Sequence, residues 1–162
     1  MTIYLIDANV LIRAHGDYYP IDRLKPFWEW LTAQGQAGRV KMPREIYDEV
    51  AKSSDLLGQW LRIPEVKKAI IFLENTNVTN LSAVLEVGYG PDLNDLELEK
   101  IGRDPFLIAS AMGGAERIVV TREVSKPKAQ RGNRKVPDVC VTMGVTCIND
   151  FELWRRLAFR ID

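Results

Sequence analysis

The first segment of the chain is a short apolar run that ends at an acid. Residues 2–6 read TIYLI, and Asp7 follows directly. Such a continuous apolar run is typical of a parallel strand that is buried on both faces. Later strands are predicted at residues 39–42, 117–120 and 144–148.

Segments with helical spacing of apolar residues separate these strands. They cover residues 9–14, 20–34, 43–52, 56–61, 64–75, 78–87, 92–100, 104–112 and 151–159. Strands that alternate with helices indicate an α/β fold with a mainly parallel sheet. The length of 162 residues is expected to form a single domain, 1–162.

Composition excludes several classes of protein. The chain is 46% hydrophobic and 27% charged, as is ordinary for a globular domain. The longest apolar stretch, residues 69–73, is far too short for a membrane span, and no signal peptide is visible, so no membrane partner is expected. Cys140 and Cys147 form no CxxC pair and fit buried thiols in a reducing compartment, so a cytoplasmic location is expected.

Histidine chemistry is also nearly excluded. His15 is the only histidine, and it stands near neither cysteine, which argues against zinc. A Ser-His-Asp triad would have to use His15, and no GxSxG motif supports one. By elimination, any metal chemistry must use carboxylates.

Four acids on four predicted elements are candidates for such a site. Asp7 and Glu123 follow strands, at the edge where open α/β sheets bind ligands. Asp104 opens a helix, and Glu49 is the acid nearest the apolar face of its own helix. Structural roles stay open, because Asp7 and Asp104 are also normal helix N-caps. Asn9 could supply the first of those caps, while Glu49 and Glu123 could simply be solvated.

The charges are balanced overall but separated along the chain. Residues 86–99 contain five acids and no base, whereas residues 126–135 contain five bases and no acid. Five clustered cations after a strand favour contacts with RNA phosphates, although a solvated loop is the alternative. The candidate RNA-binding residues are Lys126, Lys128, Arg131, Arg134 and Lys135.

Four motifs in order give the chain a family resemblance. YLIDANVLI, PREIYDEV, DPFLIASA and IVVTRE resemble the PIN domain, a family of metal-dependent ribonucleases with many VapC-type toxins, and KVPDVCVTMGVTCIND resembles an uncharacterised bacterial PIN subfamily. The resemblance spans most of the chain. It implies a three-layer α/β/α sandwich.

The resemblance also assigns roles to residues. The family's acids fall on Asp7, Glu49 and Asp104, and its strand-end Thr-x-Asp falls on Thr121-Arg122-Glu123, where glutamate replaces aspartate. Asp138 is the alternative fourth acid. Asn9 matches a small polar residue that orients ligands or water.

The resemblance implies a Mg²⁺- or Mn²⁺-dependent endoribonuclease, with carboxylates as the oxygen ligands that these hard cations prefer. It further implies a toxin with a cognate antitoxin protein, and a possible homodimer. Two rival functions remain open. One is a haloacid-dehalogenase-like phosphohydrolase with Asp7 as nucleophile, although Asp7-Ala8-Asn9 lacks that group's second aspartate. The other is a catalytically inactive PIN-like module that binds RNA or protein.

Overall fold

The computed structural model describes residues 1–162 and is built on a five-stranded sheet in which every pair of neighbouring strands is parallel. The spatial order is β3-β2-β1-β4-β5, so the first strand of the chain lies at the centre. The strands are β1 (Ile3–Ile6), β2 (Val40–Pro43), β3 (Ile71–Phe72), β4 (Arg117–Val120) and β5 (Thr146–Ile148).

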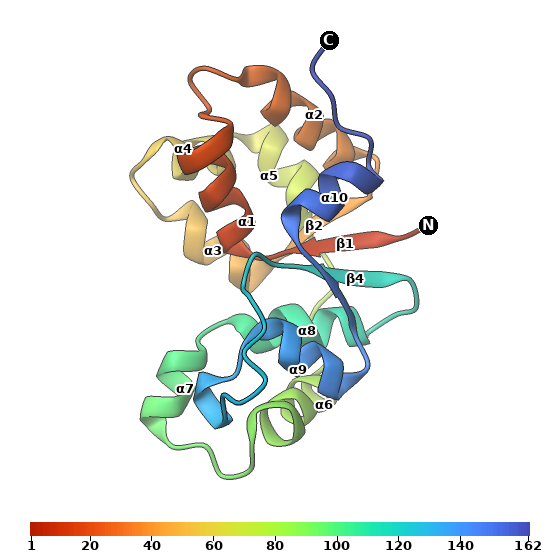
Figure 1. The fold of residues 1–162 in the computed structure, drawn as a ribbon. Coiled ribbons are helices and arrows are strands. Elements are labelled where there is room, and N and C mark those ends of the chain that lie inside the picture. The colour runs from red at the N-terminus through yellow and green to blue at the C-terminus, as the bar shows by residue number, and fades with distance from the viewer.

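Helices cover both faces of the sheet and complete a three-layer α/β/α sandwich, as Figure 1 shows. One layer contains α1 (Ala8–Arg13), α2 (Lys25–Gln36), α4 (Leu56–Arg62), α5 (Pro64–Ile70) and α10 (Asp150–Arg156). The opposite layer contains α6 (Val78–Ala83), α7 (Asp95–Ile101), α8 (Asp104–Met112) and α9 (Val136–Met143). The remaining helix, α3 (Arg44–Ala51), contacts both α1 and α8. Single π-helical or 3₁₀ turns occupy Ala14–Tyr18, Val84–Tyr89 and Arg131–Asn133.

The central strand is buried because its side chains are apolar on both faces. Leu5 and Ile6 are completely buried, and they belong to one hydrophobic cluster of 35 residues. Burial of that apolar area is the main stabilising contribution to a fold of this kind. Cys140 is buried and Cys147 is half-buried, and both are free thiols.

The structure confirms the α/β class, forms the helix α9 (Val136–Met143) where the sequence predicts no element, and corrects one predicted helix. The helix predicted over 64–75 ends at Ile70, and the chain then enters the short edge strand β3. Ile71 pairs with Met42 of β2, so an apolar run that fits a helix adds a strand to the sheet. Short apolar runs do not distinguish the two by periodicity alone.

The helices also bear on the expectation about membranes. None of them combines the length and the apolar character that crossing a bilayer requires.

Candidate active site

Asp7 is the first residue after the central strand and is 5% exposed. Its backbone N–H donates to the carbonyl of Val120 at 2.9 Å, so Asp7 stays in register with β4. Oδ1 accepts the N–H of Ala8 at 2.8 Å, which makes Asp7 the N-cap of α1. Asn9 therefore does not supply that cap, contrary to the possibility left open by the sequence.

Thr121, the first residue after β4, forms hydrogen bonds with three other residues at this edge of the sheet. Its hydroxyl donates to Oδ2 of Asp7 at 2.9 Å and accepts from Nδ2 of Asn9 and from the N–H of Glu123, both at 3.2 Å. One donated and two accepted bonds use the full capacity of a hydroxyl group. Oδ1 of Asn9 accepts the N–H of Arg122, so Asn9 holds the loop after β4 against α1. Asn9 and Thr121 thus position Asp7.

Asp104 occupies the first turn of α8 without capping the helix. Arg103 takes the N-cap position, and no side-chain hydrogen bond caps this end. The carboxyl group of Asp104 is half-buried and forms no hydrogen bond within the protein chain. The capping role that the Asp-Pro sequence allows is wrong for this residue, and the group is left available.

Glu49 lies on α3 with its side chain exposed, not at the boundary of the buried face where its helical position places it. Its negative charge nevertheless acts on both Asp7 and Asp104. Glu45, one helical turn earlier, is not among the charges that raise the pKa of Asp7 or of Asp104. Glu49, the acid identified from the helical spacing, is therefore the α3 acid whose charge acts on Asp7 and Asp104, although Glu45 is the less exposed of the two.

Glu123 is half-buried, and one of its carboxylate oxygens is already engaged. Oε2 accepts the N–H of Val136 at 2.7 Å, at the first residue of α9. Asp138, the alternative fourth acid, is fully engaged elsewhere. Its Oδ1 accepts from Ser125 Oγ and its Oδ2 accepts the N–H of Lys126 at 2.8 Å. Asp138 therefore holds the loop at Ser125 and Lys126 in place. Of these two acids, Glu123 is the one whose charge acts on Asp7 and Asp104.

The electrostatics of the edge reflect burial and mutual repulsion. Burial, opposed by the hydrogen bond from Thr121, raises the pKa of Asp7 to about 6, and the charges of Glu123 and Glu49 add to the rise. Burial and then the charge of Asp7 raise the pKa of Asp104 to about 8. Lys135 opposes this rise in pKa. Like charges held close together disfavour one another's ionised form, and this repulsion adds to the effect of burial.

The donor set suits a hard divalent cation, although the side chains do not form a closed cage. Asp7, Glu49, Asp104 and Glu123 offer only oxygen, the donor that Mg²⁺ and Mn²⁺ prefer. As the side chains stand, no three His, Cys, Asp or Glu residues are grouped closely enough to hold a metal ion. Binding would therefore draw the carboxylates inward, and Asp104 has no protein hydrogen bond to lose.

The basic segment 126–135 is not the free loop that the sequence predicts. Arg131 binds Glu97 of α7 through Nε at 2.7 Å and Nη2 at 3.1 Å. Arg134 donates to the carbonyls of Gly88 and Asp138 and to Oγ1 of Thr142. The expectation of a mobile basic loop is corrected at these two arginines, because Arg131 pairs with an acid of the stretch 86–99 and Arg134 is bound by two backbone carbonyls and a hydroxyl. Lys126, Lys128 and Lys135 form no ion pair within 4.0 Å.

Two groups at this edge are absent from the sequence-based set. Asp150 follows β5, is 2% exposed and lies 3.7 Å from Nε of Arg13. Asp150 is the second residue after β5, so the rule that selects Asp7, an acid directly after a strand, finds it only when extended by one residue. Tyr89 has a buried hydroxyl without a hydrogen-bond partner, and burial together with Asp104 raises its pKa. No sequence signal marks it.

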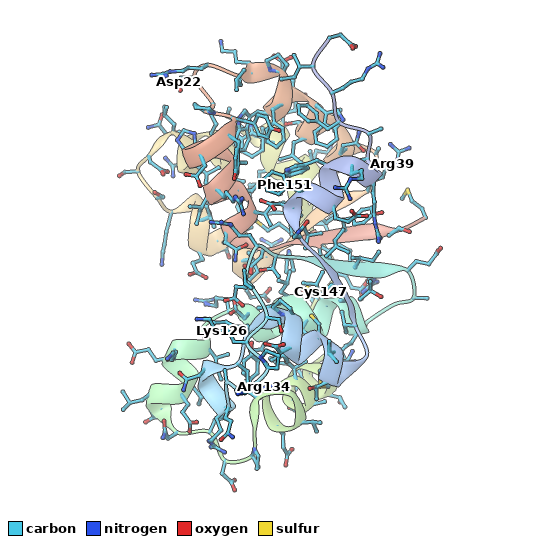
Figure 2. All side chains as sticks on the ribbon, in the orientation of Figure 1. Asp22, Arg39, Lys126, Arg134, Cys147 and Phe151 are labelled. Carbon is cyan, nitrogen blue, oxygen red and sulfur yellow. The ribbon has the colours of Figure 1, made fainter.

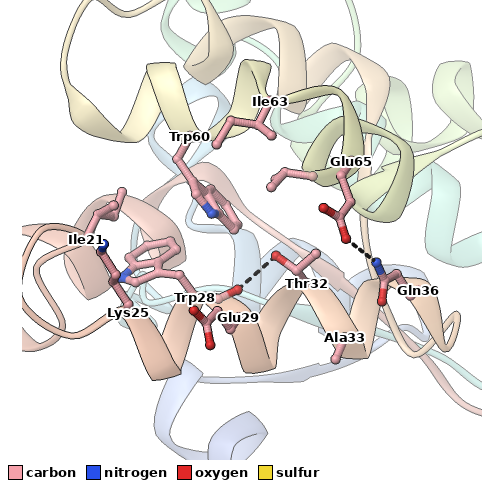
Figure 3. A pocket seen from close by; sticks show the side chains of 11 residues that line it. Ile21, Lys25, Trp28, Glu29, Thr32, Ala33, Gln36, Trp60, Ile63 and Glu65 are labelled. Carbon is pink, nitrogen blue, oxygen red and sulfur yellow. Dashed lines mark hydrogen bonds between the residues drawn. The ribbon is translucent and has the colours of Figure 1, made fainter.

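A separate cavity of about 420 Å³ lies between α2 and the α4–α5 pair. Figure 3 shows Trp28 and Trp60 in its wall, with Glu65 hydrogen-bonded to Gln36. None of its lining residues belongs to the carboxylate edge, so the cavity contributes nothing to the chemistry of that edge.

Comparison with known proteins places the chain in a family. The model of the domain of unknown function DUF4411 matches residues 4–161, and the chain belongs to that family. No curated protein and no solved structure matches it significantly.

Proposed function

We propose that this chain is a Mg²⁺- or Mn²⁺-dependent endoribonuclease. The observation that supports the proposal is that four acids from four elements act on one another at one edge of a parallel sheet, because the charges of Glu49 and Glu123 raise the pKa of both Asp7 and Asp104. Asp7 follows β1, Glu49 lies on α3, Asp104 opens α8 and Glu123 follows β4. The carboxyl ends of parallel strands are where such sheets bind their ligands.

The carboxylates would hold the metal, and the neighbouring polar groups keep them in place. Asp7 is the central ligand because it is fixed by both Ala8 and Thr121. A bound divalent cation would supply Lewis-acid activation of the phosphodiester and a water of lowered pKa. Asn9 and Thr121 orient Asp7, and Lys135 supplies a positive charge beside Asp104.

RNA is the proposed substrate because cations without an ion pair border this edge. Lys126 and Lys128 are exposed, and their segment begins only a few residues after Glu123. Lysine contacts to phosphates give affinity that depends on salt and little on sequence. With Arg131 and Arg134 engaged by the protein, the lysines carry this role.

The decisive experiment is cleavage of single-stranded RNA by purified protein in Mn²⁺, compared with Asp7→Asn. Cleavage by the wild type and none by the variant is expected. Release of phosphate from small phosphomonoesters without RNA cleavage would favour the haloacid-dehalogenase-like reaction. Neither activity, with no Mn²⁺ binding in calorimetry, would favour a non-catalytic binding module.

We further propose that the nuclease acts as the toxin of a toxin–antitoxin pair. Production of the chain in a bacterium should then stop growth, and Asp7→Asn should relieve the arrest. A small protein encoded beside it should bind the chain and restore growth. Sedimentation of the free chain tests the proposed homodimer. Unimpaired growth despite full cleavage activity in vitro would limit the proposal to the nuclease.

A further inference from the structure

Two exposed aromatic rings enclose an arginine at the start of α10. Tyr18 is 40% exposed and Phe151 is 41% exposed, and their ring centroids lie 5.3 Å apart at an angle of 70°. The guanidinium carbon of Arg13 lies 4.9 Å from the Tyr18 centroid and 4.8 Å from the Phe151 centroid. We refer to Arg13, Tyr18 and Phe151 as the aromatic–arginine cluster.

Two hydrogen bonds and the charge of a buried acid hold the residues of the cluster in place. Nη2 of Arg13 donates to the hydroxyl of Tyr18 at 2.5 Å, and Nε lies 3.7 Å from Oδ2 of Asp150. The other carboxylate oxygen of Asp150 accepts the N–H of Phe151 at 3.0 Å. One buried acid therefore orients both the arginine and the residue that carries the ring. Nε of Arg13 is buried without a hydrogen bond, so the guanidinium is held by the Nη2 bond to Tyr18, by the charge of Asp150 and by its contact with the two rings.

The cluster adjoins the carboxylate edge. Asn9 and Arg13 are four residues apart on α1 and share one face, separated by a rise of about 6 Å. Asn9 binds Thr121, which in turn binds Asp7. In Figure 2, Phe151 lies on the α1–α10 side of the sheet, whereas Lys126 lies on the side of α9. A strand that crosses this edge would meet lysines on one side and the cluster on the other.

We propose that the aromatic–arginine cluster is a stacking platform for a base of single-stranded RNA, one or two nucleotides from the bond that is cleaved. The assignment rests on the proposed function, because it places the platform beside the nuclease site. Every base has a π-face, and exposed aromatic rings and arginine planes bind such faces with little sequence preference. Asn9, which binds Thr121 beside Asp7, and Arg13 lie about one helical turn apart on α1, so a base stacked here belongs to the nucleotides that flank the cleaved bond.

The test measures binding without cleavage, by fluorescence anisotropy of labelled RNA oligomers in Ca²⁺. Phe151→Leu keeps an apolar side chain but removes the ring, whereas Phe151→Tyr keeps the ring. We expect Phe151→Leu to bind an oligoadenylate about 5- to 100-fold more weakly, and Phe151→Tyr to bind like the wild type. The slope of log K against log salt should not change, because no charge is removed. Leu96→Ala, at an exposed apolar position on α7, is the matched control.

An oligomer that contains abasic residues separates stacking from general damage. The wild type should prefer the intact strand, and Phe151→Leu should lose that preference. Equal binding of all strands by the wild type and Phe151→Leu would overturn the platform. The platform would also be overturned if Phe151→Leu lost affinity equally for intact and abasic strands. A shallower slope of log K against log salt in Phe151→Leu would overturn it too. A partner protein that protects Phe151 while RNA does not would assign the cluster to a protein interface and overturn it as well.

The outcome is distinguishable from that of the nuclease proposal. If the wild type cleaves RNA, Asp7→Asn does not, and Phe151→Leu binds normally, only the platform fails. If base-dependent binding is lost in Phe151→Leu but no RNA is ever cleaved, the platform stands and the nuclease proposal fails.

Discussion

The hydroxyl of Thr121 donates a 2.9 Å hydrogen bond to Oδ2 of Asp7, across the neighbouring parallel strands β4 and β1. Thr121 is 1% exposed and Asp7 is 5% exposed, so water cannot replace this bond freely. The bond also lowers the pKa of Asp7 against the effect of burial. A threonine that carries no charge therefore favours the ionised form of Asp7, against the larger effect of burial.

Thr121→Val should remove this control, whereas Thr121→Ser should keep it. Valine leaves a buried carboxylate with one partner fewer, which costs about 1–3 kcal/mol of stability. The pKa of Asp7 should rise above about 6, so the pH profile of cleavage should move to higher pH. Thermal unfolding and a pH–rate profile check both effects. An unshifted profile in the valine variant would contradict the role of Thr121.

Asp7→Asn should abolish RNA cleavage with a change of only a few degrees in melting temperature. The substitution removes a buried charge, which favours the fold, and disturbs the bond to Thr121, which costs about 1 kcal/mol. These effects oppose each other, and about 1 kcal/mol corresponds to roughly 2–4 °C at this size. Cleavage by the purified variant at the wild-type rate would remove Asp7 from the mechanism.

Substitutions at Glu123 and Asp138 should have opposite consequences. Glu123→Gln keeps an acceptor for the N–H of Val136 but loses the charge, so Mn²⁺ affinity and cleavage should fall while stability holds. Glu123→Asp gives up that hydrogen bond and should keep or raise activity. Asp138→Asn disrupts the bonds to Ser125 and Lys126, so stability should fall by about 1.5–3 kcal/mol. Calorimetry measures the Mn²⁺ affinity of each variant, and urea unfolding measures its stability. If Asp138→Asn lost Mn²⁺ affinity and Glu123→Gln did not, Asp138 would be the ligand.

The metal-free protein should lose stability as the pH rises from about 4 to about 8. In the folded state the pKa of Asp7 is about 6 and that of Asp104 is about 8, both above the ordinary 3.8. The folded chain therefore binds more protons than the unfolded chain within this window, and stability declines with pH. Urea unfolding at several pH values measures the decline. Mn²⁺ should flatten it, and so should Asp104→Asn; a decline of the same size in Asp104→Asn would contradict the assignment.

The lysines and the arginines of segment 126–135 should affect the salt dependence of RNA binding differently. Lys126→Ala with Lys128→Ala should make the slope of log K for RNA shallower by about 1.4, if each lysine meets one phosphate. Arg131→Ala with Arg134→Ala should lower the melting temperature, because both side chains anchor the segment to the protein. The arginine pair is the control for the lysine pair. If the arginine variant is folded and it alone shows a shallower slope of log K for RNA against log salt, Arg131 and Arg134 are the residues that bind the RNA.

Local patterns predicted much of this fold, and less of the site. The run before Asp7 and the run at 117–120 are strands because continuous apolar residues of this length favour burial between helices. The strand Ile71–Phe72 was not predicted, because its identity depends on pairing with β2 rather than on its own residues.

The same limit applies to side chains. An acid after a strand can be located at the sheet edge from the sequence, as for Asp7. Whether an arginine is free or paired depends on a partner far along the chain, as for Arg131 and Glu97, which are 34 residues apart. The sequence showed both charged stretches but not that one ion pair, between Arg131 and Glu97, joins them.

The order of strands also has a consequence for protein synthesis. Asp7 leaves the ribosome near the beginning of translation, whereas Thr121, to which it binds, follows 114 residues later. At about 5–20 residues per second, the synthesis of Asp7 and that of Thr121 are separated by roughly 6–23 s. A chain interrupted before β4 therefore lacks Thr121, and Asp7 is left without the hydrogen bond that fixes its second carboxylate oxygen.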